Sequence, residues 1–242
     1  MLLARIGLCL CFLGASCFAT QILLSPADVI GGSGAYGGNW QTGSFNATEI
    51  LDQQTGNVVD SFGTTYWLNP DNGPANAYIV IDLGAAYHIV SIDLFNTHNS
   101  GFGDRGTGNF TFEASNAITN LGGPGFDLSG PTTTILNGTL AAAPVADPIA
   151  AQSFAVSDPG SYRYFKFEPN SVATSGASCC GANNYGLNEL RVFDAPASGV
   201  PEPASFLLVA GGIALTALRC FPVARRSQRS ASESAREARK NT

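Results

Sequence analysis

The stretch Tyr78-Ile79-Val80-Ile81-Asp82-Leu83-Gly84 decides the fold class of this chain of 242 residues. Its apolar side chains alternate, so Ile79, Ile81 and Leu83 share one face of an extended strand, which Gly84 ends. Alternation of this kind is typical of a strand with one face in the core and the other toward solvent. We therefore expect a half-buried β-strand at this position.

The same rhythm returns in further short segments at residues 89–95, 109–114, 164–167 and 190–193. Clusters of Gly, Asn and Pro separate these segments, and no stretch has the periodicity and caps of a long amphipathic helix. Residues 119–152 are loop-like, with one or two strands expected among them. The pattern predicts an all-β domain, an antiparallel β-sandwich with one buried face per sheet.

Residues 1–19 differ in character from the middle of the chain. Arg5 precedes an apolar run, and Cys17-Phe18-Ala19 ends it. A charged start, an apolar stretch and small residues predict a secretory signal peptide, cleaved after Ala19, and export by the Sec route. The alternative is an uncleaved membrane helix, for which the apolar run is short, since a bilayer needs about 20 residues.

The C-terminal part has three segments of different character. A small, Pro-containing linker at 195–203 leads into an apolar span at 204–220, which we predict to be a transmembrane helix. A basic tail at 221–242 follows, with Arg225 and Arg226 near its start. Arginines behind an apolar span favour a cytoplasmic position for that end. The predicted β-domain therefore covers residues 20–194.

The middle of the chain is acidic and the tail is basic. From residue 20 to 199, four basic residues stand against fifteen acidic ones, a formal balance of −11, whereas from 204 onward the balance is +5. An acidic domain argues against nucleic acid as a partner, because phosphates require Lys and Arg. The chain also lacks motifs such as Gly-x-Ser-x-Gly, and His88 and His98 are its only histidines. We therefore expect no enzyme activity.

The triplet Pro201-Glu202-Pro203, the apolar span and the arginines together resemble the PEP-CTERM sorting signal. The resemblance implies an exosortase-type processing enzyme as a partner, which cuts near the triplet. The protein would then pass from the inner membrane to the cell surface or extracellular matrix. Chains of this kind usually end soon after the arginines, whereas this one continues with the polar residues 227–242. The alternative is an ordinary membrane anchor that is never cut.

The segments 66–68, 77–84, 89–92, 163–167 and 186–193 resemble the discoidin family (coagulation-factor type C domains) in order and spacing. That family shows a Trp, an apolar-Asp-Leu-Gly strand and a following strand of the form Val-x-x-Ile. The resemblance covers roughly residues 45–193 and implies a galactose-binding-like jelly-roll sandwich. Its members mostly bind glycans, lipids or proteins through loops at one end.

The resemblance also implies a structural calcium site. In that family, calcium is held by an acidic residue, a Thr and a Glu. The corresponding residues here are Asp52, Thr55 and Glu189, whose oxygen atoms suit Ca²⁺. Gln53 stands where the family usually has Gly, which puts the geometry of this loop in doubt. In the alternative interpretation, Asp52 caps a turn and Glu189 is a solvated strand residue.

A second group of polar residues directly follows the predicted strand at 89–95. It comprises Asn96, His98, Asn99, Asp104 and Arg105. An Arg can make bidentate contacts, and His or Asn can bind sugar hydroxyls, so the group is a candidate ligand site. The alternative is an internal network in which these side chains order a long loop, since loop side chains commonly hydrogen-bond to backbone.

Four aromatic residues in loop-like stretches add to the candidates. They are Tyr36, Trp40, Tyr66 and Trp67, of which we expect Trp67 to pack in the core and exposed ones to stack on sugar rings. We expect a non-catalytic module that binds carbohydrate, such as extracellular polysaccharide, in adhesion or a biofilm matrix. The alternative is a purely structural matrix protein, cross-linked through the adjacent Cys179 or Cys180.

Overall fold

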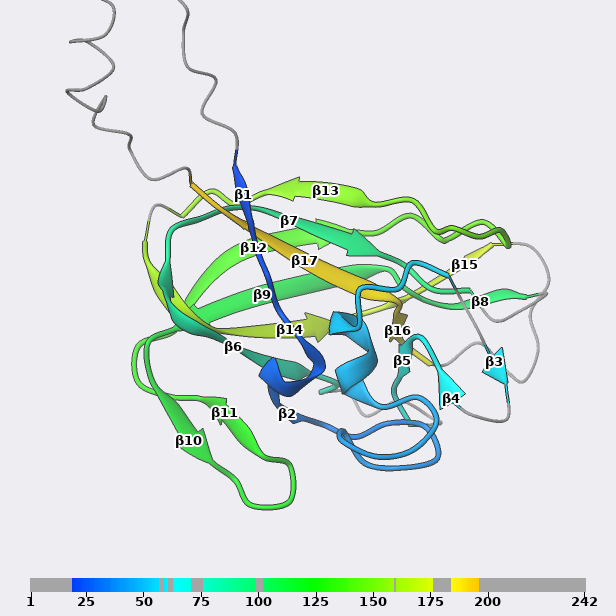
Figure 1. Cartoon of the computed structure of the whole chain (residues 1–242), viewed down its shortest axis with the longest axis horizontal. Helices are drawn as coiled ribbons and strands as arrows, with labels where there is room; N and C mark the ends of the chain where they lie inside the picture. The colour runs from blue at the N-terminus through cyan, green and yellow to red at the C-terminus, as the bar shows by residue number, and fades with distance from the viewer. Residues whose placement is uncertain are drawn as a thin grey trace, which may run out of the picture. The chain divides into compact units, whose positions relative to one another are not determined.

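A computed structural model of the chain describes residues 19–56, 59–60, 63–70, 76–98, 102–158, 160–175 and 184–195 (Figure 1). The predicted signal peptide up to residue 18, the transmembrane helix and the sorting motif lie outside the described residues. Asn99, Cys179 and Cys180 lie outside them as well. None of the helices in the described part of the chain has the length and hydrophobicity that a bilayer crossing requires.

Two antiparallel sheets form the body of the domain (Figure 1). The larger sheet has the strand order β12 (Thr133–Thr139), β9 (Asn109–Ser115), β14 (Tyr162–Pro169), β6 (Ile79–Tyr87) and β2 (Val29–Gly32). The smaller sheet has the order β1 (Thr20–Ile22), β17 (Glu189–Asp194), β7 (Ile89–Phe95) and β13 (Gln152–Ala155). The all-β prediction is thus confirmed, and each segment predicted from alternation contains a strand.

Shorter elements connect and extend these sheets. They are two 3-10 helices, η1 (Pro26–Asp28) and η2 (Ala47–Leu51), and the strand pairs β10 (Ile118–Asn120) with β11 (Phe126–Leu128), β15 (Val172–Ser175) with β8 (Gly103–Thr107), β16 (Gly186–Leu187) with β5 (Trp67–Leu68), and β3 (Val59–Asp60) with β4 (Gly63–Thr64). Most of them lie at the ends or on the outer face of the sandwich (Figure 1).

The core lies between the inward faces of the two sheets. Ile79 on β6 and Phe112 on β9 flank Phe167 of the central strand β14 in register. The rings of Phe112 and Phe167 are 5.1 Å apart, and Trp67 meets Phe167 edge-on at 6.5 Å. Leu190 of the smaller sheet belongs to the same buried cluster. The fully buried Trp67 also donates its indole N–H to the carbonyl of Gly34 at 3.1 Å, so its predicted core position is confirmed.

The β10–β11 hairpin folds over the outer face of the larger sheet. Val80 alternates with the inward Ile79 and Ile81 and so faces outward, yet it is fully buried. β11 contacts β2, β14 and β6. An ion pair holds it there, because the Nζ of Lys166 on β14 lies 3.1 Å from Oδ1 of Asp127 on β11. The hairpin therefore adds a third layer at one edge of the sandwich.

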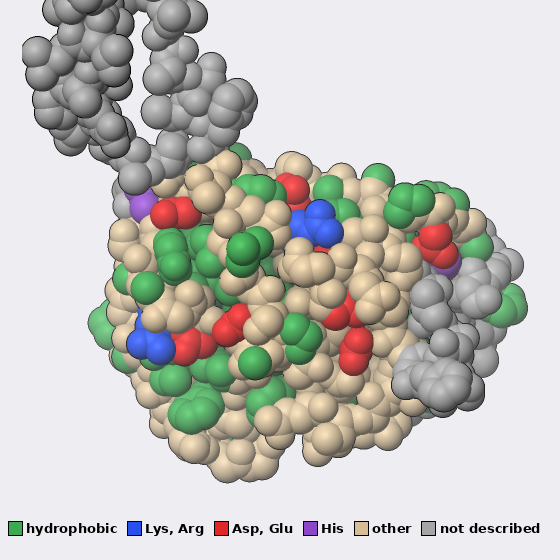
Figure 2. Space-filling model, viewed as in Figure 1, with side chains coloured by type: hydrophobic (Ala, Val, Ile, Leu, Met, Phe, Trp, Pro, Cys, Tyr) green, Lys and Arg blue, Asp and Glu red, His purple; other side chains and the backbone are tan. Residues whose placement is uncertain are grey.

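The surface reflects the acidic composition. Asp and Glu side chains are spread over the face drawn in Figure 2, whereas Lys and Arg are sparse there. Several of the basic side chains pair with acids, as Arg163 does with Asp82 at 2.7 Å. The face therefore offers no extended basic patch to a polyanion.

Candidate functional site

The predicted ligand group after β7 begins with a buried amide. Asn96 is fully buried, and its Nδ2 donates to the carbonyls of Thr107 at 2.9 Å and Ala141 at 2.8 Å. Its Oδ1 accepts from the N–H groups of Thr97 at 3.0 Å and Thr107 at 2.9 Å. These four bonds use the full capacity of the amide. Asn96 thus takes the role foreseen in the alternative interpretation, that of an internal network joining β7 to β8.

The other described members of that group are also largely buried. His98 is 3% exposed, and its Nε2 lies 3.3 Å from Oδ1 of Asp147. Asp104 is fully buried, and Nε of Arg105 lies 4.0 Å from its Oδ1. The Arg105 guanidinium stands 5.8 Å from the centre of the Tyr36 ring. The fold brings these side chains to the same end of β7 and β8, and sugar binding by them stays a prediction.

Two of the three predicted calcium residues, Asp52 and Glu189, lie next to each other around a buried carboxyl group. Asp52 follows η2, and Glu189 is the fully buried first residue of β17. The N–H of Gln53 donates to Oε2 of Glu189 at 3.0 Å, and the Nε2 of Gln53 donates to Oε1 at 3.1 Å. The main-chain carbonyl of Thr55 accepts from Ile149 at 2.6 Å. Glu189 is therefore not the solvated residue of the alternative interpretation.

The two carboxyl groups of this cluster perturb each other. Burial, followed by the nearby charge of Asp52, raises the pKa of Glu189 to about 8. Burial also raises the pKa of Asp52, although N–H groups of Gln54 reach its two oxygens at 2.8 and 3.1 Å. That turn agrees with the capping role considered for Asp52.

The described arrangement does not fit a calcium ion at these residues. Calcium takes six to eight oxygen ligands, whereas N–H donors of Gln53 face both oxygens of Glu189. No group of three or more His, Cys, Asp or Glu side chains within the described residues could hold a metal ion.

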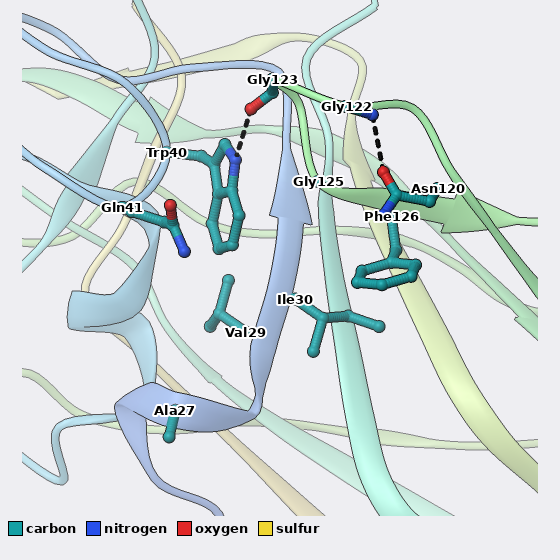
Figure 3. A pocket seen from close by; sticks show the side chains of 10 residues that line it. All are labelled: Ala27, Val29, Ile30, Trp40, Gln41, Asn120, Gly122, Gly123, Gly125 and Phe126. Atoms are coloured by element: carbon teal, nitrogen blue, oxygen red, sulfur yellow. Dashed lines mark hydrogen bonds between the residues drawn. The ribbon is translucent and has the colours of Figure 1, made fainter.

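A pocket that sequence analysis did not find lies between β2 and the β10–β11 hairpin (Figure 3). Its volume is about 380 Å³, which lies within the range of small-molecule pockets. Its lining comes from η1, β2, the following loop and the hairpin, and consists of Ala27, Val29, Ile30, Trp40, Gln41, Asn120, Gly122, Gly123, Gly125 and Phe126. The pocket thus depends on segments about 80 residues apart, which only the folded chain brings together.

Trp40 forms one wall of this pocket (Figure 3). Its indole N–H donates to the carbonyl of Gly123 at 3.1 Å, which ties the loop to the hairpin and fixes the ring. A Cβ at Gly125 would lie only 2.8 Å from Cζ2 of Trp40, and Gly125 has a φ of +79°. Glycine is therefore required there, because it alone permits both the left-handed turn and the close approach of the ring. Val29, Ile30 and Phe126 complete the apolar lining.

Two amide side chains supply the polar part of the lining. The Oδ1 of Asn120 accepts from the N–H of Gly122 at 2.7 Å, which orients the side chain, and its NH₂ group donates to no described residue (Figure 3). The exposed Gln41 has no side-chain hydrogen bond to any described residue. Of the four loop aromatics considered from sequence, Trp40 lines this pocket although only 6% of it is exposed, and Tyr66 and Trp67 are fully buried.

No protein-family model matches the chain, and no curated protein matches it. Several solved structures are similar to it. A family 32 carbohydrate-binding module of NanJ from Clostridium perfringens, in complex with galactose, has 16% identity, covers 73% of this chain and 100% of its own, and has a TM-score of 0.45. A C-terminal chitobiase domain from Bacteroides fragilis has 17% identity, coverages of 74% and 100%, and a TM-score of 0.45.

A further family 32 module from Clostridium perfringens, in complex with GalNAc-β-1,3-galactose, shows 13% identity. The match covers 72% of this chain and 99% of that module, with a TM-score of 0.45. At these levels of identity and superposition, the likenesses assign no ligand to this chain.

Proposed function

We propose that the β-sandwich is a non-catalytic carbohydrate-binding module and that it takes a neutral sugar in the pocket beside Trp40. The observation that carries this proposal is the combination of an aromatic wall with two amide side chains in one pocket. A sugar ring has apolar C–H faces and a rim of hydroxyl groups, so it needs both kinds of contact. Small-molecule sites combine an apolar lining with a few placed polar groups in the same way.

The chemistry of the lining supports hydroxyl recognition. The NH₂ of Asn120, which has no partner among the described residues, is a donor, and the amide of Gln41 offers both donors and an acceptor. The C–H groups of a sugar would lie against the apolar wall that Trp40 and Phe126 provide. Hydroxyl groups can both donate and accept hydrogen bonds, so a lining that offers both donors and an acceptor can bind them.

The absence of charge in the lining supports a neutral ligand and a binding role. None of the ten lining residues carries a charge, so a uronic acid would find no cationic partner among them. The acidic surface of the domain also repels anionic polymers. Glycoside hydrolysis requires a pair of carboxyl groups flanking the bond, which this lining does not contain.

The terminal segments support a surface location for this module. The signal-peptide pattern ending at Ala19 supports export, and Pro201-Glu202-Pro203 with Arg225 and Arg226 supports sorting by an exosortase. On this proposal, the span at 204–220 holds the protein in the inner membrane before processing, after which the module serves in adhesion or in a biofilm matrix.

A glycan array tests the binding proposal, with the purified protein compared with Gln41→Ala. We expect the wild type to bind one or more neutral glycans. Gln41→Ala should weaken this binding about tenfold by removing one or two hydrogen bonds without altering the fold. Gln54→Ala is the matched control, because it removes another exposed glutamine outside the pocket. No binding by folded wild-type protein would overturn the proposal and favour the structural matrix alternative.

A further inference from the structure

Gln53 has an unusual backbone conformation. Its φ is 66°, and it is the only described residue other than glycine with a positive φ. A side chain in this left-handed region brings its Cβ close to the carbonyl oxygen, so such positions usually hold Gly, Asn or Asp. A glutamine that persists here needs compensating contacts.

The compensating contacts are made to Glu189. The left-handed turn directs both the main-chain N–H and the side-chain NH₂ of Gln53 toward one carboxyl group, at 3.0 Å from Oε2 and 3.1 Å from Oε1. Gln21 on β1 approaches the other end of the same amide, with its Nε2 at 3.4 Å from Oε1 of Gln53. The amide of Gln53 therefore bridges the N-terminal strand and the last strand of the smaller sheet.

The charged groups around Glu189 show why its buried carboxyl group needs hydrogen-bond donors. Asp52 lies near it and exerts a like charge, and the charge of Asp52 also contributes to raising the pKa of Glu49. Arg191 is the described cation near it, with Nε at 3.9 Å from Oε1 of Glu189. Burying a carboxyl group beside another carboxyl group is costly unless donors or a cation satisfy it.

We propose that Gln53 takes the place of a bound cation, so that the cluster of Asp52 and Glu189 is held by amide donors and the domain is stable without calcium. The left-handed backbone and the two-point contact point to the same conclusion, and no group of three acidic ligands occurs among the described residues. The Gln53 amide then joins the end of η2 to the start of β17. This inference is independent of the glycan proposal.

The isosteric variant Gln53→Glu tests the inference, since it exchanges the NH₂ donor for a third carboxylate. Thermal unfolding of the purified protein is followed in chelator and in millimolar calcium. The wild type should unfold at the same temperature in both. The Tm of Gln53→Glu should fall by about 2–4 °C in chelator, the size of one lost hydrogen bond in a domain of this length, and recover in calcium. Recovery is expected because three carboxylates supply the oxygen ligands that calcium prefers.

The control is Gln41→Glu, which adds the same charge at an exposed glutamine outside this cluster and should show no calcium response. A wild-type Tm that rises in calcium would overturn the inference, as would a Gln53→Glu variant that matches the wild type in chelator. Should Gln53→Glu fail to fold, calorimetric titration of calcium into the wild-type protein decides the matter. Heat from binding overturns the inference, and its absence supports it.

Discussion

Asp82, in the middle of the fold-determining stretch, shows how a single outward residue joins two strands. Its Oδ1 accepts from Nε of Arg163 on β14 at 2.7 Å, and its Oδ2 accepts from Nη2 at 2.9 Å. The hydrogen bonds from Arg163 hold the pKa of Asp82 below its usual value of 3.8. A carboxyl group that binds its proton less tightly in the folded state adds stability above its unfolded pKa.

Replacing Asp82 should lower the stability of the domain by an amount that depends on pH in a defined direction. Asp82→Asn should lower the Tm modestly at neutral pH, since Arg163 is partly exposed and solvent screens the pair. The difference between variant and wild type should close as the pH falls through the pKa of the folded carboxyl group, below 3.8. Thermal melts from pH 7 to pH 2 measure it, and a constant difference over this range would contradict the assignment.

For single residues, the sequence indicates where a residue lies in the fold better than it indicates which groups its side chain contacts. The resemblance placed Asp52 and Glu189 at one site, and the structure does bring them together. It could not place the Gln53 amide on Glu189, because that contact depends on a left-handed backbone which glutamine rarely adopts. The full burial of Asn96 could not be predicted from the sequence either, because a polar residue after a strand is compatible with either a surface loop or an internal network.

Among the elements, the β10–β11 hairpin forms one side of the proposed sugar site. Lys166 reaches it from β14, 3.1 Å from Oδ1 of Asp127 and 3.0 Å from Oε1 of Glu168 on its own strand. The ammonium also lies 4.6 Å from the centre of the Tyr78 ring. The hairpin is therefore positioned by this mostly buried ion pair, by the hydrogen bonds from Trp40 to Gly123 at 3.1 Å and from Gly32 to Pro124 at 3.0 Å, and by the close approach of Gly31 and Gly125.

Lys166→Met should loosen the hairpin, because it keeps the aliphatic stem and removes the charge. We expect faster amide hydrogen exchange at residues 118–128, weaker glycan binding and a Tm about 2–4 °C lower, corresponding to about 1 kcal/mol. Glu168→Gln is the control, since it removes the partner on the same strand and leaves Asp127 paired. Hairpin exchange equal to the wild type in Lys166→Met would show that the ion pair does not hold this element.

Some of the strands could be predicted from the sequence, and others could not. Strands β6, β7, β9, β14 and β17 follow from alternation, because each buries one face against the other sheet. The hairpin at 118–128 was expected only as part of a loop-like region, since its strands are short and rest on the outer face of a sheet. Its turn depends on Gly122 and Gly125, both with a φ of +79°.

For the whole molecule, we propose an acidic sugar-binding module that carries signals for export and sorting. We therefore expect the mature protein recovered from the cell surface to begin near residue 20 and to end near Pro201-Glu202-Pro203. Mass spectrometry of the intact exported protein measures both ends. A mature protein that retains residues 204–242 would support the uncut membrane anchor instead.

The most direct test that a sugar binds in the pocket uses the two tryptophans of the chain, Trp40 in the pocket and Trp67 in the core. The protein is titrated with the neutral glycan selected on the array, and tryptophan emission is recorded beside calorimetry. We expect a saturable shift in tryptophan emission that disappears in Trp40→Phe, together with about tenfold weaker binding by Gln41→Ala. Binding detected by calorimetry that leaves the emission unchanged, with Gln41→Ala equal to the wild type, would place the sugar outside the pocket beside Trp40.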